Sequence, residues 1–160
     1  MVFLVVSALA QDPSTAVEAN GTVVVECVVP QSEAEVRALL ADPQRAASLT
    51  PEILGVTTLA RGDCLTLGVT VKGAWDPLTY TSSRCATATG FKYKLLSSDD
   101  ITAYEAEWRL VPQSGGGTKV TYRVLTEVDL PVPRSLVRKG IVDSARETIK
   151  SLVRQLAKAR

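Results

Sequence analysis

The spacing of hydrophobic residues divides the chain into a short mixed region, a long region of period two and a final region of period 3.6. The short region contains residues 21–30, GTVVVECVVP, whose β-branched side chains and final proline predict a strand. Ser32 and Glu35 then show the S-x-x-E spacing of a capping box, which predicts the start of a helix. Pro43 interrupts this helix, so we expect a second short helix at about residues 44–49.

The long region, residues 53–129, alternates between apolar and polar side chains and is broken at intervals by turn-forming residues. Because the loops between the alternating segments are short, neighbouring strands must run antiparallel. The pattern predicts six strands, at about residues 53–61, 64–73, 76–88, 91–98, 101–112 and 117–129.

The final region begins after the sequence DLPVP and predicts one helix over about residues 134–158, the longest element of the chain. Its apolar stripe consists of Val137, Ile141, Ala145, Thr148, Leu152 and Leu156.

Together these elements predict an α+β fold with a curved seven-stranded antiparallel sheet, two short helices after the first strand and a long C-terminal helix. One face of such a sheet must be covered, and only the C-terminal helix has a matching length. We therefore expect the sheet to grip this helix and to leave a space between the two.

The order of these elements resembles the START/Bet v 1-type helix-grip superfamily, to which polyketide cyclase-like and ubiquinone-binding-type proteins belong. The hairpin W-R-L-V-P…G-G-G-T-K-V-T-Y and the long helix after a proline-containing link carry the resemblance, which covers about residues 20–158. The resemblance implies a hydrophobic cavity for lipids, sterols, polyketides or isoprenoid quinones. The superfamily has no universal functional residue, so no role is transferred to a residue of this chain.

Alternation along the strands places all four tyrosines and one tryptophan on the face toward the helix. Two interpretations remain open: these side chains fill a core, or they line a cavity in which tyrosine hydroxyls meet an amphipathic ligand. Gly140, in the middle of the helix at a cost of about 1 kcal/mol relative to Ala, would leave room for such a ligand. The candidate ligand-binding residues are Leu67, Val69, Tyr80, Ser82, Arg84, Tyr93, Tyr104, Trp108, Tyr122, Gly140, Ile141 and Ser144.

Arg84 is the charged residue among these candidates. In a regular strand it points inward, whereas Glu105 and Glu107, which could neutralise it, alternate to the outer face. A buried guanidinium needs an acidic partner, so an inward Arg84 predicts an anchor for an acidic head group at the cavity mouth. The alternatives are a β-bulge that turns the side chain outward and an extension of its head into water.

Cys64 and Cys85 begin and end a predicted hairpin, and both lie on its outer face. If Lys72 pairs with Pro77, the two cysteines are directly opposite in a non-hydrogen-bonded pair, which is close enough for a disulfide. A Gly73-Ala74 turn instead shifts the register by two and makes them diagonal. The alternative to a disulfide is a pair of free thiols in a reducing compartment.

The third cysteine, Cys27, lies in the first strand without an evident partner and is expected to be buried as a small apolar side chain. With no CxxC spacing among the three cysteines, we expect no metal site.

The amino-acid composition excludes several catalytic mechanisms and metal sites. The 160-residue chain contains no histidine, which excludes Ser-His-Asp and Cys-His catalysis and histidine-ligated metals. The formal net charge of +1 gives no sign of nucleic-acid binding. We expect no cofactor and, because no compact acid–base group is visible, we favour a non-catalytic protein.

The composition of the first twenty residues suggests how the chain is divided into a signal, a linker and a domain. Residues 2–6 are all apolar, and Ala8-Leu9-Ala10 shows a small-x-small pattern typical of a secretory cleavage site, although no basic residue precedes the apolar run. We interpret them as a shortened export signal, which predicts a periplasmic or secreted protein; an apolar first strand or a disordered end in a cytoplasmic protein is the alternative. Residues 11–20 are expected to form a linker and residues 21–160 a single ligand-binding domain.

Residues 131–160 carry eight basic and two acidic side chains. A basic amphipathic helix can contact anionic membranes, but a solvated outer face explains the charges as well.

Three functions therefore compete. We favour a carrier of a hydrophobic small molecule such as a lipid, isoprenoid quinone or polyketide. The alternatives are a polyketide cyclase/aromatase-like enzyme and a module for protein or membrane-surface interaction. The oligomeric state is not predicted.

Overall fold

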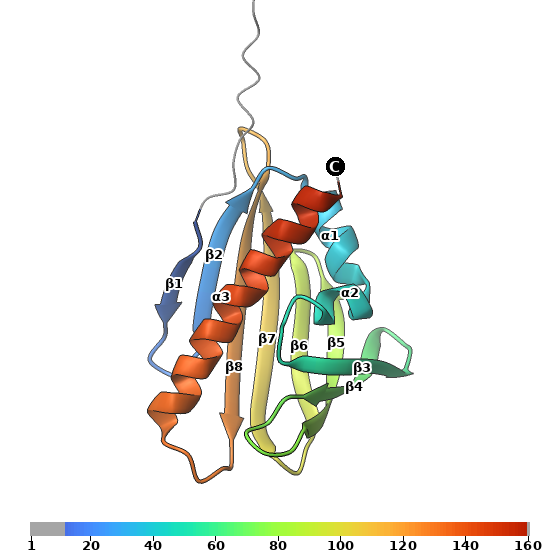
Figure 1. The fold of residues 1–160 in the computed structure, drawn as a ribbon. Coiled ribbons are helices and arrows are strands. Elements are labelled where there is room, and N and C mark those ends of the chain that lie inside the picture. Colours follow the sequence, from blue (N-terminus) through green and yellow to red (C-terminus); the bar gives the residue numbers. More distant parts are fainter. Residues whose placement is uncertain (1–11, 160) are drawn as a thin grey trace, which may run out of the picture.

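A computed structural model describes residues 12–159 and has the predicted α+β architecture, an open antiparallel sheet with a long C-terminal helix across one face (Figure 1). The elements in chain order are β1 (Ser14–Val17), β2 (Val23–Val29), α1 (Glu33–Ala41), α2 (Pro43–Ala47), β3 (Ile53–Ala60), β4 (Cys64–Val71), β5 (Leu78–Thr87), β6 (Gly90–Ser97), β7 (Ile101–Pro112), β8 (Thr118–Val128) and α3 (Arg134–Lys158). The predicted export signal lies outside the described residues.

The sheet has eight strands rather than the seven predicted, in the order β1-β2-β8-β7-β6-β5-β4-β3. The additional strand, β1, falls within residues 11–20, which we expected to be a linker. It pairs antiparallel with β2, and the chain reverses between them through Gly21, whose φ of 92° favours glycine. β1 is only four residues long and mostly exposed, so it has no alternating pattern that could reveal it.

Helix α1 begins at the capping box that the sequence predicts, and α2 begins at a side-chain cap that was not predicted from the sequence. Ser32 and Glu35 form the complete capping box of α1, with each side chain bound to the backbone N–H of the other residue. The Asp42 carboxylate accepts hydrogen bonds from the backbone of Gln44 and Arg45 and so caps α2, whose first residue is Pro43.

Helix α3 crosses the sheet diagonally and packs against β2 and β8 (Figure 1). Its buried residues are Ala145, Thr148, Ile149, Leu152 and Leu156, all in the middle and the C-terminal part of the helix. Leu136, near the start of the helix, is exposed. Within the described residues, no helix is long and apolar enough to cross a membrane.

The buried side chains form two clusters. The first, here called the helix-covered core, combines β2, β7 and β8 with α1 and α3; its members include Val25, Leu40, Val120, Ile149 and Leu152. The second, here called the strand-only core, consists of Leu67, Val69, Tyr80 and Ile101 with partly buried neighbours that also come from strands. The strand-only core exists because the β3–β4 end of the sheet folds across β5 and β6 (Figure 1).

Candidate ligand-binding site

A cavity of about 50 Å³ lies where the two cores meet, between the inner face of the sheet and α2. This volume holds a few water molecules and is well below the roughly 300–1,000 Å³ of a typical small-molecule site. Its lining is mostly apolar and aromatic. The lining residues are Pro43, Ala46, Ala47, Thr50, Ile53, Val56, Leu67, Val69, Tyr80, Ser82, Tyr93, Tyr104, Ala106, Trp108 and Tyr122.

The structure brings together the candidates that were chosen from the strands. Leu67 and Val69 on β4, Tyr80 and Ser82 on β5, Tyr93 on β6, Tyr104 and Trp108 on β7 and Tyr122 on β8 all line this cavity. They meet because inward residues of neighbouring antiparallel strands form rows across the sheet, as in the pairs Val69–Tyr80 and Trp108–Tyr122.

The candidates on the helix lie elsewhere, so the expected position of the cavity, between the sheet and α3, needs correction. Gly140 is exposed, and open space surrounds its α-carbon. Ile141 packs against the helix-covered core, and the Ser144 hydroxyl donates a 2.7 Å hydrogen bond to Glu52. The cavity wall opposite the sheet is therefore provided by α2 and the segment after it, and no residue of α3 lines the cavity.

Sequence reasoning did not identify the α2 wall. Pro43, Ala46, Ala47 and Thr50 give no periodic signal, because the helix is only five residues long and its lining side chains are small. Small side chains here leave the volume open. Thr50 also holds this segment to α3, since its hydroxyl lies 2.9 Å from the Thr148 hydroxyl.

The four tyrosines form an aromatic wall around the cavity. Tyr80 and Tyr104 contact each other with ring centroids 5.0 Å apart, and Tyr122 stacks on Trp108 at 4.4 Å. Burial raises the pKa of Tyr80 to about 12 and also raises the pKa of Tyr104 and Tyr122. Their hydroxyls therefore remain neutral and able to donate hydrogen bonds at physiological pH.

Arg84 points inward, as a regular strand requires, and is buried next to the cavity rather than lining it. Its Nη2 donates a long hydrogen bond of 3.4 Å to the Leu40 carbonyl, and its guanidinium carbon lies 4.4 Å from the centre of the Phe91 ring. Burial raises the pKa of Tyr93, which pairs with Arg84 across β5 and β6, and the positive charge of Arg84 opposes that rise. The bulge and solvent alternatives for Arg84 are therefore wrong.

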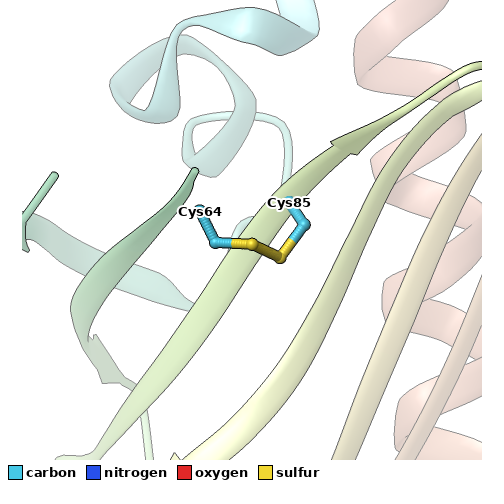
Figure 2. Close-up of a disulfide and its surroundings, with 2 residues drawn as sticks. All are labelled: Cys64 and Cys85. Carbon is cyan, nitrogen blue, oxygen red and sulfur yellow. A yellow bond between two sulfur atoms is a disulfide. The ribbon is translucent and has the colours of Figure 1, made fainter. Parts of the chain in front are cut away.

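On the outer face of the sheet, Cys64 and Cys85 form a disulfide between β4 and β5 (Figure 2). The two residues are directly opposite in the strand register, and their α-carbons are 4.4 Å apart, which matches a non-hydrogen-bonded pair. The disulfide therefore links β4 and β5, the two strands that carry one side of the cavity.

Cys27, in contrast, is buried and free, and burial raises the pKa of its thiol to about 11.

The outer face also has a wider open groove of about 480 Å³. Its floor carries Lys92 opposite Glu107 and Lys94 opposite Glu105, so opposite charges are paired across β6 and β7. Because the groove is open and its charges alternate in sign, it offers little to a hydrophobic molecule. The smaller inner cavity is thus the better candidate site.

Comparison with solved structures places this fold among proteins of varied function. A START superfamily protein from Mycobacterium smegmatis has a TM-score of 0.76 and 22% sequence identity, over 87% of this chain and 99% of that one. The Zhui aromatase/cyclase from Streptomyces sp. R1128 has a TM-score of 0.60 and 22% identity, over 86% and 87%. A STAR-related lipid transfer protein from Xanthomonas axonopodis has a TM-score of 0.63 and 18% identity, over 92% and 99%.

No curated protein sequence gives a significant match to this chain. A family model described as "Polyketide cyclase / dehydrase and lipid transport" matches residues 20–158, which include every strand from β2 to β8 and all three helices. The chain therefore belongs to the polyketide cyclase/dehydrase and lipid transport family, within the helix-grip superfamily whose pattern of elements its sequence shows.

Proposed function

We propose that the protein binds and carries a hydrophobic or amphipathic small molecule, such as a lipid, an isoprenoid quinone or a polyketide-like compound, without changing it chemically. The observation that carries this proposal is the inner cavity, whose wall is mostly apolar and aromatic, with hydroxyls from its tyrosines, Ser82 and Thr50. Such a wall suits a ligand with a large apolar part and a few polar atoms. Membership of a family described by lipid transport and polyketide cyclisation supports the same class of ligand.

A ligand of this class is larger than the cavity of about 50 Å³, so the volume of the cavity must increase on binding. The α2 wall is the part that can move most easily, because it is short and its polar ties to other elements are few. Gln44 donates to the Val56 carbonyl at 2.8 Å, Gln155 donates to the Ser48 hydroxyl at 3.3 Å, and Thr50 contacts Thr148. The sheet side, in contrast, is held by continuous strand pairing and the disulfide. Binding is therefore expected to displace α2 from β3 and to leave the sheet unchanged.

The proposal includes an oxidising location, either periplasmic or extracellular. The Cys64–Cys85 disulfide and the small-x-small pattern near the N-terminus support it. Fractionation of the host cell, followed by detection of the protein, would test this location directly; recovery only from the cytoplasm would contradict it.

Native mass spectrometry of the protein purified from its host tests the proposed function. We expect an apolar molecule to remain bound and to be released by organic solvent. Ala46→Phe, which fills the cavity from α2, should abolish its retention, whereas Ala41→Phe, on an exposed position at the end of α1, should not. A protein without bound molecule that also fails to take up any added fatty acid, sterol or quinone would refute the proposal.

A cyclase/aromatase-like enzyme is the second candidate. The observation that favours it is that Arg84 and three tyrosine hydroxyls, those of Tyr80, Tyr93 and Tyr104, converge near the cavity and could polarise a carbonyl group. Mass spectrometry of the retained molecule during prolonged incubation separates the two functions. A carrier returns the molecule with its mass unchanged, and an enzyme converts it to a product of different mass.

A further inference from the structure

Two buried polar atoms on β5 have no hydrogen-bond partner. Within the described part of the chain, Ser82 Oγ and Arg84 Nε are the buried side-chain nitrogen or oxygen atoms left without one. Ser82 is 1% exposed and Arg84 is 7% exposed. Leaving a buried donor unpaired costs roughly 1–3 kcal/mol, and more for a charged group, so two such atoms side by side indicate that something else pairs with them.

The positive charge of Arg84 also lacks a counter-charge. None of the carboxylates of residues 12–159 forms an ion pair with it. Glu107 lies on the opposite face of the sheet and pairs with Arg109. The immediate contacts of the guanidinium are a carbonyl oxygen at 3.4 Å, the ring of Phe91 and the neutral hydroxyl of Tyr93, and none of them carries a charge that neutralises it.

Strand geometry directs both atoms toward the same place. Ser82 and Arg84 are two residues apart on β5, so their side chains leave the same face of the sheet. Tyr93 is the direct cross-strand neighbour of Arg84, and both Ser82 and Tyr93 line the cavity. A group at the β5–β6 end of the cavity would therefore meet a hydroxyl from each strand and the guanidinium beside them.

We infer that this end of the cavity binds the carboxylate head group of an amphipathic ligand, which accepts hydrogen bonds from Arg84 Nε, Ser82 Oγ and the Tyr93 hydroxyl. The inference rests on the proposed carrier function and names the chemical class of its ligand. A carboxylate suits the site because its planar pair of oxygens matches the edge of a guanidinium. Its single negative charge equals the single positive charge available, whereas a phosphate dianion would leave a buried negative charge uncompensated.

The test compares two probes with the same chain, decanoate and 1-decanol, by isothermal titration calorimetry at pH 7.5. The wild-type protein should bind decanoate at least tenfold more tightly, because a hydrogen bond to a charged group contributes more than a neutral one. Arg84→Met should remove this preference, because it should weaken decanoate binding at least tenfold more than it weakens decanol binding. Arg109→Met, which removes an exposed arginine on the outer face, should keep the preference.

The outcomes separate the two proposals. Equal affinity for decanoate and decanol in the wild-type protein would overturn the carboxylate site and leave the carrier function standing. If neither probe binds, nor any other apolar molecule, the carrier function fails and the carboxylate site with it. A preference for decanoate that survives Arg84→Met would also overturn the assignment of the site.

Two further measurements apply if Arg84→Met does not fold. Arg84→Lys keeps the charge but has no Nε–H at that place, so it should lose most of the preference for decanoate. In the wild-type protein, the NMR signal of the Arg84 Nε–H should shift when decanoate is added and stay in place with decanol. A signal that responds equally to both probes would overturn the inference without any substitution.

Discussion

The helix-covered core and the strand-only core differ in what closes them. In the first, α1 and α3 seal the sheet, and residues such as Val25, Val120 and Leu152 are fully buried. In the second, the apolar partners all come from strands, and most of the hydrophobic side chains packed against this core are only partly buried. The cavity lies where the two cores meet, with α2 as one wall, and both unpaired polar atoms lie on β5 beside it. The comparison teaches that packing is complete in the middle of the helix-covered core, and that unfilled space and unpaired polar groups remain at its junction with the strand-only core.

The largest expected effect is the loss of stability on truncating a leucine of the helix-covered core, which is compared with the equivalent truncation in the strand-only core. Leu152→Ala should lower the free energy of unfolding by about 4 kcal/mol, because tightly packed surroundings cannot collapse into the new void. Leu67→Ala, beside the existing cavity, should cost about 2 kcal/mol. Urea denaturation of both variants measures the difference, and equal losses would show that the two cores are packed equally well.

The disulfide should matter most to the strand-only core. Replacing Cys64 and Cys85 together by Ala should lower the free energy of unfolding by about 3 kcal/mol, since the bond closes a loop with a sequence separation of 21 residues. Hydrogen exchange should accelerate first in β4 and β5, with β2 and β8 still protected. Uniform acceleration across the sheet would mean that the two regions open as one unit.

High pH should weaken the protein through the cavity tyrosines. Burial raises the folded-state pKa of Tyr80 to about 12, above the unfolded value near 10, so its contribution is complete below pH 10 and is lost as the pH rises toward 12. This shift corresponds to roughly 3 kcal/mol for Tyr80. Ultraviolet absorbance of phenolate, recorded together with circular dichroism, should show ionisation only as the fold is lost. Tyrosines that ionise near pH 10 in an intact fold would show that water reaches the wall freely.

The smallest expected effect contrasts an unpaired hydroxyl with a paired one. Ser82→Ala should leave the ligand-free protein as stable as before or more stable by up to about 1 kcal/mol, because it removes a buried group that has no partner. Thr118→Val should destabilise by about 1–2 kcal/mol, because the Thr118 hydroxyl donates to the Gln31 carbonyl at 2.9 Å. Thermal unfolding of the two variants compares them; a clear loss for Ser82→Ala would indicate that the structure satisfies this hydroxyl after all.

Prediction from the sequence succeeded where the information is local. The six strands from residue 53 onward and the C-terminal helix have the predicted order, because alternation and helical spacing are properties of neighbouring residues. The cysteine pair also follows from a short hairpin: of the two registers left open, the structure has Cys64 opposite Cys85 and Val71 opposite Leu78. Arg84 points inward for the same reason, since β5 pairs with β4 without a register shift from Leu78 to Arg84.

Prediction from the sequence failed where contacts between segments distant in the sequence determine the structure. β1 is too short to show a period and exists because the exposed edge of β2 accepts it. Gly140 and Ile141 were assigned to the cavity because the helix was expected to cover the whole sheet, but α3 packs mainly on β2 and β8. The alanines of α2, which do line the cavity, carry no pattern that distinguishes them from other small residues.

By itself, then, the sequence determined the type and order of most elements, the inward set of side chains on each strand and the opposition of the two cysteines. Only the tertiary structure decided which half of the sheet α3 covers, that α2 closes the cavity, and that Ser82 and Arg84 keep donors without partners beside it. The physical reason is that periodicity records which face of an element is apolar, whereas the curvature of the sheet and the diagonal path of the helix determine what that face meets.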